Sequence, residues 1–299
     1  MSRIVAATVS LALIAASGVF VLFDAGAASA MLPLFKRQAA PAVKVSEEQP
    51  PAAPSEKPEP SPPVRPRPFK AGEELSYAFG WKGVPCADFR VYLTEEEKDG
   101  TKYLTVNYEA KTRKVIALFW SFAASGKTYL DVNSLLPAHA SSTAKERSRQ
   151  KNLTIVFDRA AKIARTTKEK VYKKKSSTKD ISFKTGLDIP AALFYVRTLK
   201  FSMGKTESLE VLDSDKLYSI EMTPVARERI EVTAGTYETL ALDVRVRQLN
   251  GSKSERSEQE AKYKTIRVWI SDDKARLPVR MKSEVFVGSV YAELVSVKE

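Results

Sequence analysis

Cysteine and histidine are nearly absent from this chain of 299 residues, which contains only Cys86 and His139 of these types. A single cysteine cannot form an internal disulfide, and no Cys-x-x-Cys pair is available for thiol exchange. One cysteine and one histidine are also too few for the usual zinc ligand sets. We therefore expect no metal and no other cofactor, and a fold held together by its hydrophobic core.

The motifs of several common enzyme classes are missing as well. The chain has no Gly-x-Ser-x-Gly, no Gly-x-Gly-x-x-Gly and no Gly-x-x-x-x-Gly-Lys-Ser/Thr. The chain therefore lacks the nucleophile elbow of the α/β-hydrolases and the glycine-rich loops that bind dinucleotides and nucleotide phosphates, so these three functions are not expected. A nucleophile–base pair would have to use Cys86, Ser141 or Ser142 with His139, and nothing in the spacing supplies a third, orienting group. The sequence predicts a protein that is not an enzyme, with no catalytic residues.

Charge is missing from the run Ile4 to Phe23, which follows Arg3 and contains only small or apolar side chains. This composition indicates a membrane-targeting segment within residues 1–30. Ala28-Ser29-Ala30 offers the small side chains that a signal peptidase accepts, which predicts cleavage after Ala30. The alternative is an uncleaved inner-membrane anchor, because twenty residues at ~1.5 Å each span a bilayer core. Either outcome places the remaining chain in the periplasm or cell envelope.

Residues 31–70 change composition abruptly and hold eleven of the sixteen prolines. Proline fixes φ and removes backbone donors, so no core forms from this segment. We expect an extended, polyproline-II-like tether that is disordered on average. It either holds residues 71–299 away from a membrane or forms a disordered N-terminus of the mature protein.

Residues 71–299 are long enough to form one β-rich domain. In Thr101 to Lys111, alternate residues such as Leu104 and Val106 are apolar, which is the pattern of a half-buried strand. The same alternation recurs in 88–94, 152–158, 217–222, 229–233, 241–247, 264–270, 279–286 and 290–297. Turn signals separate the runs, including Lys98-Asp99-Gly100. The pattern predicts a curved antiparallel meander, barrel-like or half-barrel, and does not distinguish a barrel from a sandwich.

Two segments are predicted to be helical. Asp188 and Pro190 form a helix start, and the helix is expected to run to about residue 201 before Gly204. A shorter candidate covers residues 115–122. We expect the longer helix to pack on the open face or mouth of the sheet.

Several motifs together resemble the exported bacterial proteins of the domain of unknown function 3108 family. The resemblance spans nearly all of Gly72 to Leu294. It rests on Gly72-Glu73-Glu74-Leu75-Ser76-Tyr77 with Trp81-Lys82-Gly83, Asp188, Tyr195-Val196-Arg197, Thr233-Ala234-Gly235-Thr236-Tyr237, Trp269-Ile270-Ser271-Asp272-Asp273, Leu277-Pro278-Val279 and Gly288-Ser289-Val290. The chain departs from the family at Val84-Pro85-Cys86-Ala87, where a glycine is usual. The resemblance implies an envelope β-domain without assigned catalysis or ligand.

The recurring motif residues have structural explanations. We expect Gly235 and Gly288 to adopt positive φ in turns, Pro278 to start an edge strand, and Trp269 to anchor the core. Asp272-Asp273 is expected to form a turn, because a hard cation needs more oxygen ligands than two carboxylates supply.

Positive charge is concentrated in residues 145–179, where thirteen Lys and Arg residues stand against three acidic ones in a chain of net charge +12. If 152–158 and 162–167 pair as a hairpin, the cations share a surface that attracts anions over ~8 Å at physiological salt. The candidate patch for an anionic partner comprises Arg147, Arg149, Lys151, Lys168, Lys170, Lys173, Lys174 and Lys175. The alternative is a solvated edge whose lysines prevent strand aggregation.

Two functional hypotheses follow from this pattern. The first is a binding module for an anionic or amphiphilic envelope component, such as a lipid, lipopolysaccharide or acidic wall polymer. The second is a structural or assembly protein that contacts other envelope proteins through strand edges or the tether. Nucleic acid is not an expected partner, because Tyr172 is the one aromatic residue among the lysines. Residues 4–23 add membrane association if they remain uncleaved.

Overall fold

The computed structural model describes residues 67–251, 265–284 and 288–299. The predicted leader and nearly all of the predicted tether lie outside the described residues. Within those ranges, no helix has both the length and the apolar character needed to cross a bilayer.

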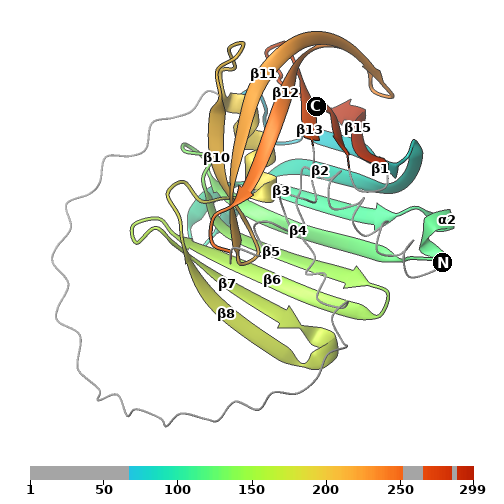
Figure 1. Cartoon of the computed structure of the whole chain (residues 1–299). Helices are drawn as coiled ribbons and strands as arrows, with labels where there is room; N and C mark the ends of the chain where they lie inside the picture. Colours follow the sequence, from blue (N-terminus) through green and yellow to red (C-terminus); the bar gives the residue numbers. More distant parts are fainter. Residues whose placement is uncertain (1–66, 252–264, 285–287) are drawn as a thin grey trace, which may run out of the picture.

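The described chain is dominated by strands, which Figure 1 shows in sequence order. The first group is β1 (Glu74–Trp81), β2 (Val84–Lys98), β3 (Thr101–Thr112), β4 (Phe122–Asp131), β5 (Pro137–Glu146), β6 (Arg149–Asp158), β7 (Ile163–Lys170) and β8 (Lys175–Ser182). The second group is β9 (Leu187–Asp188), β10 (Glu207–Asp213), β11 (Lys216–Val232), β12 (Gly235–Gln248), β13 (Thr265–Ser271), β14 (Pro278–Glu284) and β15 (Ser289–Lys298). The helices are α2 (Lys114–Ala117) and α3 (Ile189–Tyr195), with 3₁₀ turns at Val171–Lys173 and Val196–Thr198.

All fifteen strands belong to one sheet with the order β8-β7-β6-β5-β4-β3-β2-β1-β15-β14-β13-β12-β11-β10-β9. Neighbouring strands pair antiparallel except β9 and β10, which are parallel. Antiparallel pairing of β1 with β15 joins the two halves of the chain. Strands β8 and β9 are the two edge strands, so the sheet is curved but not closed by hydrogen bonds into a barrel. The predicted curved meander is confirmed in its half-barrel form.

The sheet curves until its two ends pack against each other, and a hydrophobic cluster that we call the seam cluster fills this contact. Its residues are Ala140, Ile155, Phe157, Ala164, Phe183, Leu212 and Leu217. The first four come from β5, β6 and β7, whereas Leu212 and Leu217 come from β10 and β11. Side-chain packing therefore holds together two ends that share no hydrogen-bonded strand pair.

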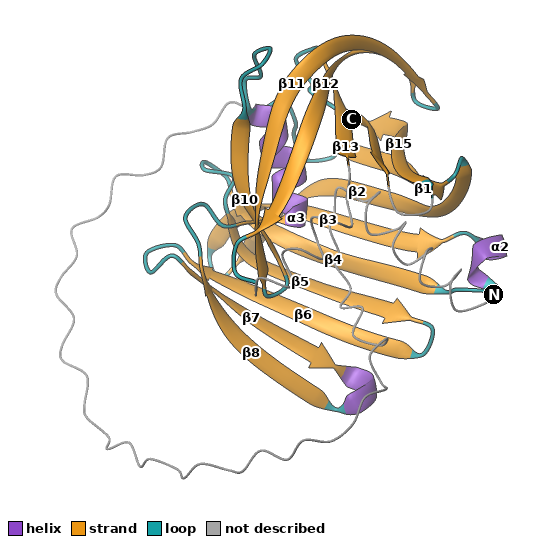
Figure 2. Cartoon of the chain, viewed as in Figure 1, coloured by secondary structure: helices purple, strands orange, loops and turns teal. Residues whose placement is uncertain are grey.

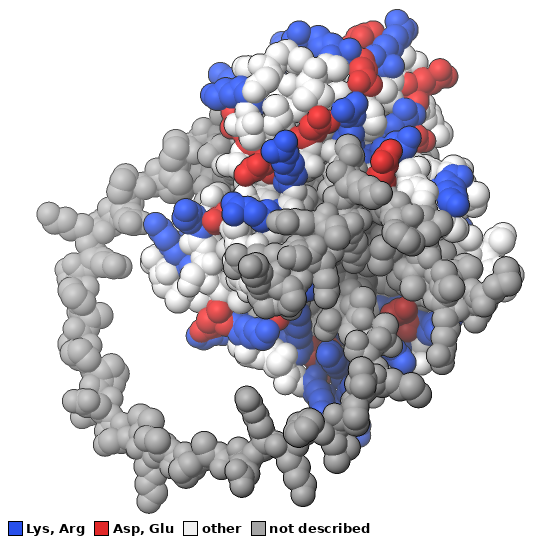
Figure 3. All heavy atoms as spheres, viewed as in Figure 1, with Lys and Arg blue, Asp and Glu red and all other residues white. Residues whose placement is uncertain are grey.

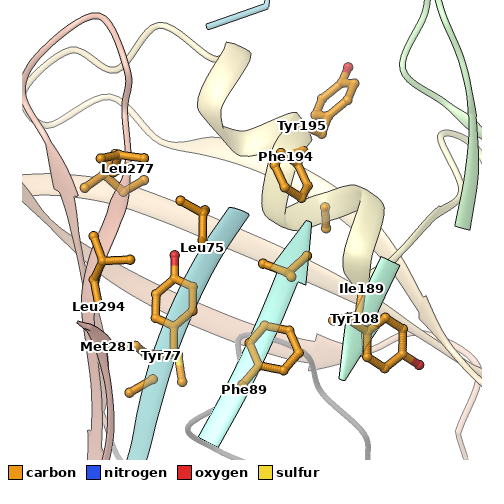
Figure 4. Packing of buried hydrophobic residues seen from close by; sticks show 14 of the residues in the cluster. Leu75, Tyr77, Phe89, Tyr108, Ile189, Phe194, Tyr195, Leu277, Met281 and Leu294 are labelled. Carbon is orange, nitrogen blue, oxygen red and sulfur yellow. The ribbon is translucent and has the colours of Figure 1, made fainter. Parts of the chain in front are cut away.

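Helix α3 lies inside the curve of the sheet (Figure 2) and supplies one wall of the main core. Figure 4 shows Phe194 and Ile189 of α3 directed towards the strands that carry Leu75 and Phe89. Asp188 caps the helix by accepting a hydrogen bond from the Ala191 amide at 3.0 Å, as the sequence predicts. The cap and the buried face of α3 fix the helix against the concave side.

The structure corrects three details of the sequence analysis. The short helix ends at Ala117, and residue 122 already belongs to β4, so the predicted range 115–122 is wrong over its second half. The predicted strands 217–222 and 229–233 are parts of one strand, β11. Pro278 starts β14, which lies between β13 and β15 rather than at an edge. Gly235 and Gly288 have φ of +134° and +85°, as expected.

Candidate functional site

A buried ion pair fastens α3 to the beginning of the domain. Arg197, directly after α3, is 1% exposed and forms a two-pronged ion pair with Glu73, which is 6% exposed. The Arg197 Nη2 to Glu73 Oε2 distance is 3.1 Å. The Arg197 Nε donates to the Ala275 carbonyl at 3.0 Å, which also ties the helix to the turn between β13 and β14.

Aromatic rings surround this ion pair and exclude water from it. The guanidinium of Arg197 lies 5.0 Å from the Phe69 ring centre and 5.5 Å from that of Phe194. The two rings meet edge to face at 5.1 Å. Close by, the hydroxyl of Tyr77 donates to the Pro278 carbonyl at 3.0 Å. Three of the sequence motifs that carry the family resemblance, those containing Glu73, Arg197 and Pro278, thus meet in one structural junction.

An apolar cavity of about 120 Å³ lies between α3 and the concave face of the sheet. Most of its lining comes from aliphatic and aromatic side chains of both halves. Its lining includes Phe79, Phe89, Leu193, Val196, Leu209, Ile220, Met222, Val244, Ile266, Val268, Met281 and Ala292. Leu193, Ile220 and Val244 are only half-buried, so one side of the cavity reaches solvent. Such a site suits an apolar ligand.

A smaller cavity of about 60 Å³ lies beside the start of α3, and its lining includes the carboxyl-bearing residues Asp188 and Asp213. The hydroxyl of Thr128 donates to Asp188 at 2.5 Å. Burial raises the pKa of Asp188 to about 6, although Thr128 and the Ala191 amide act in the opposite direction. This carboxyl therefore changes charge at mildly acidic pH.

The eight residues of the predicted basic patch come together at one end of β6, β7 and β8. Cross-strand pairing places Lys151 opposite Lys170, and Lys170 opposite Lys175. Arg147 lies in the β5–β6 turn, Arg149 begins β6, and Lys173 and Lys174 lie between β7 and β8. The predicted pairing of 152–158 with 162–167 is confirmed. Figure 3 shows Lys and Arg along the lower edge of this view, where β7 and β8 lie.

One patch residue, Lys168, has a structural role. Lys168 and Lys179 both donate to the carboxylate of Asp215 in the β10–β11 turn, with Lys179 Nζ at 2.6 Å. Burial pushes the pKa of Asp215 upwards, but the hydrogen bonds and charges of the two lysines lower it to about 2. These contacts lie across the seam, so they join the two ends of the sheet.

The apolar cavity and the basic patch are separate sites, because no patch residue lines the cavity. Among the described residues, no group of three or more His, Cys, Asp or Glu side chains is arranged to hold a metal.

Cys86 and His139, one of the nucleophile–base pairs considered from the sequence, are far apart. The ring of His139 packs against Tyr103 near the start of β3, with ring centres 6.4 Å apart. The carbonyl of Cys86 accepts from the Arg113 amide just beyond the end of β3. Ten residues of strand separate Tyr103 from Arg113, or about 30 Å at ~3.3 Å per residue. Cys86 and His139 therefore cannot act as a pair.

Sequence reasoning missed the Glu73–Arg197 junction and the apolar cavity. The two partners of the ion pair are 124 positions apart, and each looks like an ordinary surface charge. The only available signal was that both belong to family motifs. The cavity combines side chains from eight strands with those of α3 and the 3₁₀ turn after it. Alternation within one strand does not indicate how tightly the side chains of the other elements pack against it.

Comparison with curated proteins gives no match. Among solved structures, the chain is similar to a β-barrel-like protein of domain of unknown function DUF1849 from Brucella abortus, with 10% identity, a TM-score of 0.47, and coverage of 79% of this chain and 98% of that chain. It is also similar to a protein from Bacteroides fragilis described as exported with a YmcC-like fold, with 9% identity, a TM-score of 0.31, and coverage of 79% and 100%. A third, from Parabacteroides distasonis and described as a lipoprotein, has 9% identity, a TM-score of 0.33, and coverage of 80% and 100%.

The family comparison agrees with the motifs. The model of the family described as protein of unknown function (DUF3108) matches residues 75–295, which include all strands from β2 to β14 and α3. The match covers well over half of the chain, so this protein belongs to the DUF3108 family.

Proposed function

We propose that this chain is an exported, non-catalytic protein of the bacterial envelope whose half-barrel holds the apolar part of an amphiphilic envelope component. The acyl chain of a lipid or of lipopolysaccharide has the required chemistry. The envelope location rests on the uncharged run at residues 4–23 and on the small side chains at Ala28 and Ala30.

The apolar cavity is the observation that carries this proposal. A dry apolar cavity of ~150 Å³ accepts a molecule the size of benzene. The cavity of about 120 Å³ therefore suits a short stretch of an acyl chain rather than a whole lipid. The half-buried side chains of Leu193, Ile220 and Val244 provide an apolar path to solvent, along which the rest of the amphiphile would leave.

The separation of Cys86 from His139 supports a non-catalytic role, since the sequence offers no other cysteine or histidine. The alternative role is assembly with other envelope proteins through strand edges, and the features of the edge strand β8 argue against it. This edge strand is exposed along most of its length and carries Lys175 and Lys179, and lysines on an edge oppose pairing with another strand. A partner that crosslinks along β8 in cells would favour the assembly role.

The proposal is tested by titrating the full-length protein with a dansyl-labelled undecanoic acid and following its fluorescence. Ala292→Leu fills the cavity, because Ala292 is 6% exposed and lines it. The matched control is Ala123→Leu, at an exposed position of β4 away from the cavity.

We expect wild type and Ala123→Leu to bind the probe alike and Ala292→Leu to bind it at least about tenfold more weakly, because added methylenes occupy the ligand's space. Absence of binding to wild type, or equal binding by all three proteins, would overturn the proposal. Circular dichroism and urea unfolding establish that the variants are folded.

A further inference from the structure

Exposed apolar side chains gather at one end of the half-barrel. The β1–β2, β3–β4, β5–β6 and β7–β8 connections all lie at this end, because the strands alternate in direction. Of nine large apolar side chains that are exposed among the described residues, six lie on these connections or at their borders. The apolar members of this docking rim are Val84, Val115, Leu118, Phe119, Val171 and Tyr172.

The three side chains around residue 118 are far more exposed than apolar side chains at the boundary of a core. Leu118 is 82% exposed, Phe119 is 75% exposed and Val115 is 70% exposed. Val115 lies in the short helix α2 and Leu118 and Phe119 directly follow it; α2 projects from the end of the sheet in Figure 2. Contiguous exposed apolar groups on a soluble domain mark an interaction surface.

Exposed cations lie on the same connections. The basic members of the docking rim are Lys114, Arg147, Arg149, Lys173, Lys174 and Lys175. Contacts join the turns into one surface: the Arg147 guanidinium donates to the Phe119 carbonyl at 3.1 Å. The Arg149 guanidinium lies 5.9 Å from the centre of the Tyr172 ring. Apolar and basic groups therefore alternate on a continuous rim.

The lysines behind this rim are arranged in a row. Lys151, Lys170 and Lys175 stand directly opposite one another on β6, β7 and β8, at an interstrand spacing of ~4.8 Å. Phosphate headgroups of a bilayer form a surface with many anionic groups, so several cations of such a row contact it at once.

We propose that the docking rim binds the surface of an anionic lipid bilayer. Leu118, Phe119 and Tyr172 would enter the boundary between headgroups and acyl chains, while the cations contact lipid phosphates. An acidic wall polymer would engage the cations and leave the apolar tips in water, so the combination favours a bilayer. This docking does not involve the apolar cavity, and it stands or falls independently of the proposed amphiphile binding.

The test places an environment-sensitive NBD fluorophore at the rim of the full-length protein. Leu118→Cys provides the attachment site, and Cys86 reacts poorly because it is only 3% exposed. Val225→Cys, at an exposed position of β11, is the control position. Each labelled protein is mixed with vesicles of phosphatidylcholine alone or with added phosphatidylglycerol, and emission is recorded against lipid concentration.

We expect a blue shift and a rise in NBD emission at position 118 with phosphatidylglycerol vesicles, and none at position 225. Adding Lys173→Gln and Lys175→Gln should weaken partitioning about thirtyfold, at about fivefold per cation. Lys205→Gln with Lys274→Gln, which removes two exposed charges outside the rim, should leave it unchanged. Phe119→Ser should weaken it at least about tenfold.

Three outcomes would overturn the docking proposal. The first is an unchanged spectrum at position 118 with anionic vesicles. The second is an equal response at positions 118 and 225, or equal responses with and without phosphatidylglycerol. The third is blue-shifted, strong NBD emission at position 118 before any vesicle is added, because the docking rim would then already be buried against another part of the protein. Fatty-acid binding by the same preparations reports separately on the cavity.

Discussion

Removing Arg197 should destabilise this protein more than removing any surface charge. Its guanidinium is 1% exposed, pairs with Glu73 through two nitrogens and donates to the Ala275 carbonyl. Arg197→Met keeps much of the apolar volume but leaves the Glu73 carboxylate buried without its cation. Breaking a buried pair in this way costs about 3–5 kcal/mol of unfolding free energy. Adding Glu73→Gln removes the uncompensated charge, so the double variant should recover a large part of that loss.

The assay is urea unfolding at pH 7, followed by tryptophan fluorescence. Arg165→Met is the matched control, because Arg165 also makes a two-nitrogen pair, with Asp180, but its side chain is 66% exposed. The control should lose much less stability than Arg197→Met, because solvent screens an exposed ion pair. Equal losses for Arg197→Met and Arg165→Met, or no recovery in the double variant, would refute the view that the buried junction holds α3 in place.

Three further predictions concern the helix cap, the seam and the cavity. Because burial raises the pKa of Asp188 from 3.8 to about 6, the stability contributed by its bound proton is present below about pH 4 and lost as pH rises through 6. Asp188→Asn retains a capping oxygen and should gain up to about 3 kcal/mol over wild type between pH 4 and 7 in urea unfolding; a constant difference would contradict this. Asp215→Asn should cost about 1 kcal/mol at pH 7, a loss that shrinks as pH falls from 4 to 2, because the lysines lower the pKa of Asp215 to about 2; a loss that is the same at both ends of that range would argue against the ion pairs across the seam. Ala292→Leu should leave the unfolding midpoint unchanged or raised, since it fills existing space, and a loss above about 3 kcal/mol would show that the cavity has no room for it.

Local features of the fold were predictable because they depend on neighbouring residues. The alternation of Leu104 and Val106 with polar side chains identified β3, and Asp188 followed by Pro190 identified the start of α3. The strand pairing that gathers the basic residues followed from two adjacent runs joined by a turn. The segment 118–122 was misassigned because its apolar residues suit either a helix or an exposed tip.

Features that depend on distant segments were not predictable. Glu73 and Arg197 meet only because the curved sheet brings the start of β1 against the end of α3. Lys168 looked like one cation among many, yet Asp215 from the far end of the sheet binds it across the seam. The exposure of Phe119 could not be predicted either, because an apolar residue is expected to be buried. In the fold, no neighbouring element covers this side chain, which is 75% exposed.

Mass spectrometry of lipids that co-purify with the full-length protein from its native envelope tests the central claim most directly. We expect an acyl-chain-containing lipid in wild type and Ala123→Leu at a comparable ratio to protein. We expect that ratio to fall at least about tenfold in Ala292→Leu. Wild-type protein that carries no lipid, or an Ala292→Leu variant that carries as much as wild type, would contradict the proposal that the half-barrel holds an envelope amphiphile.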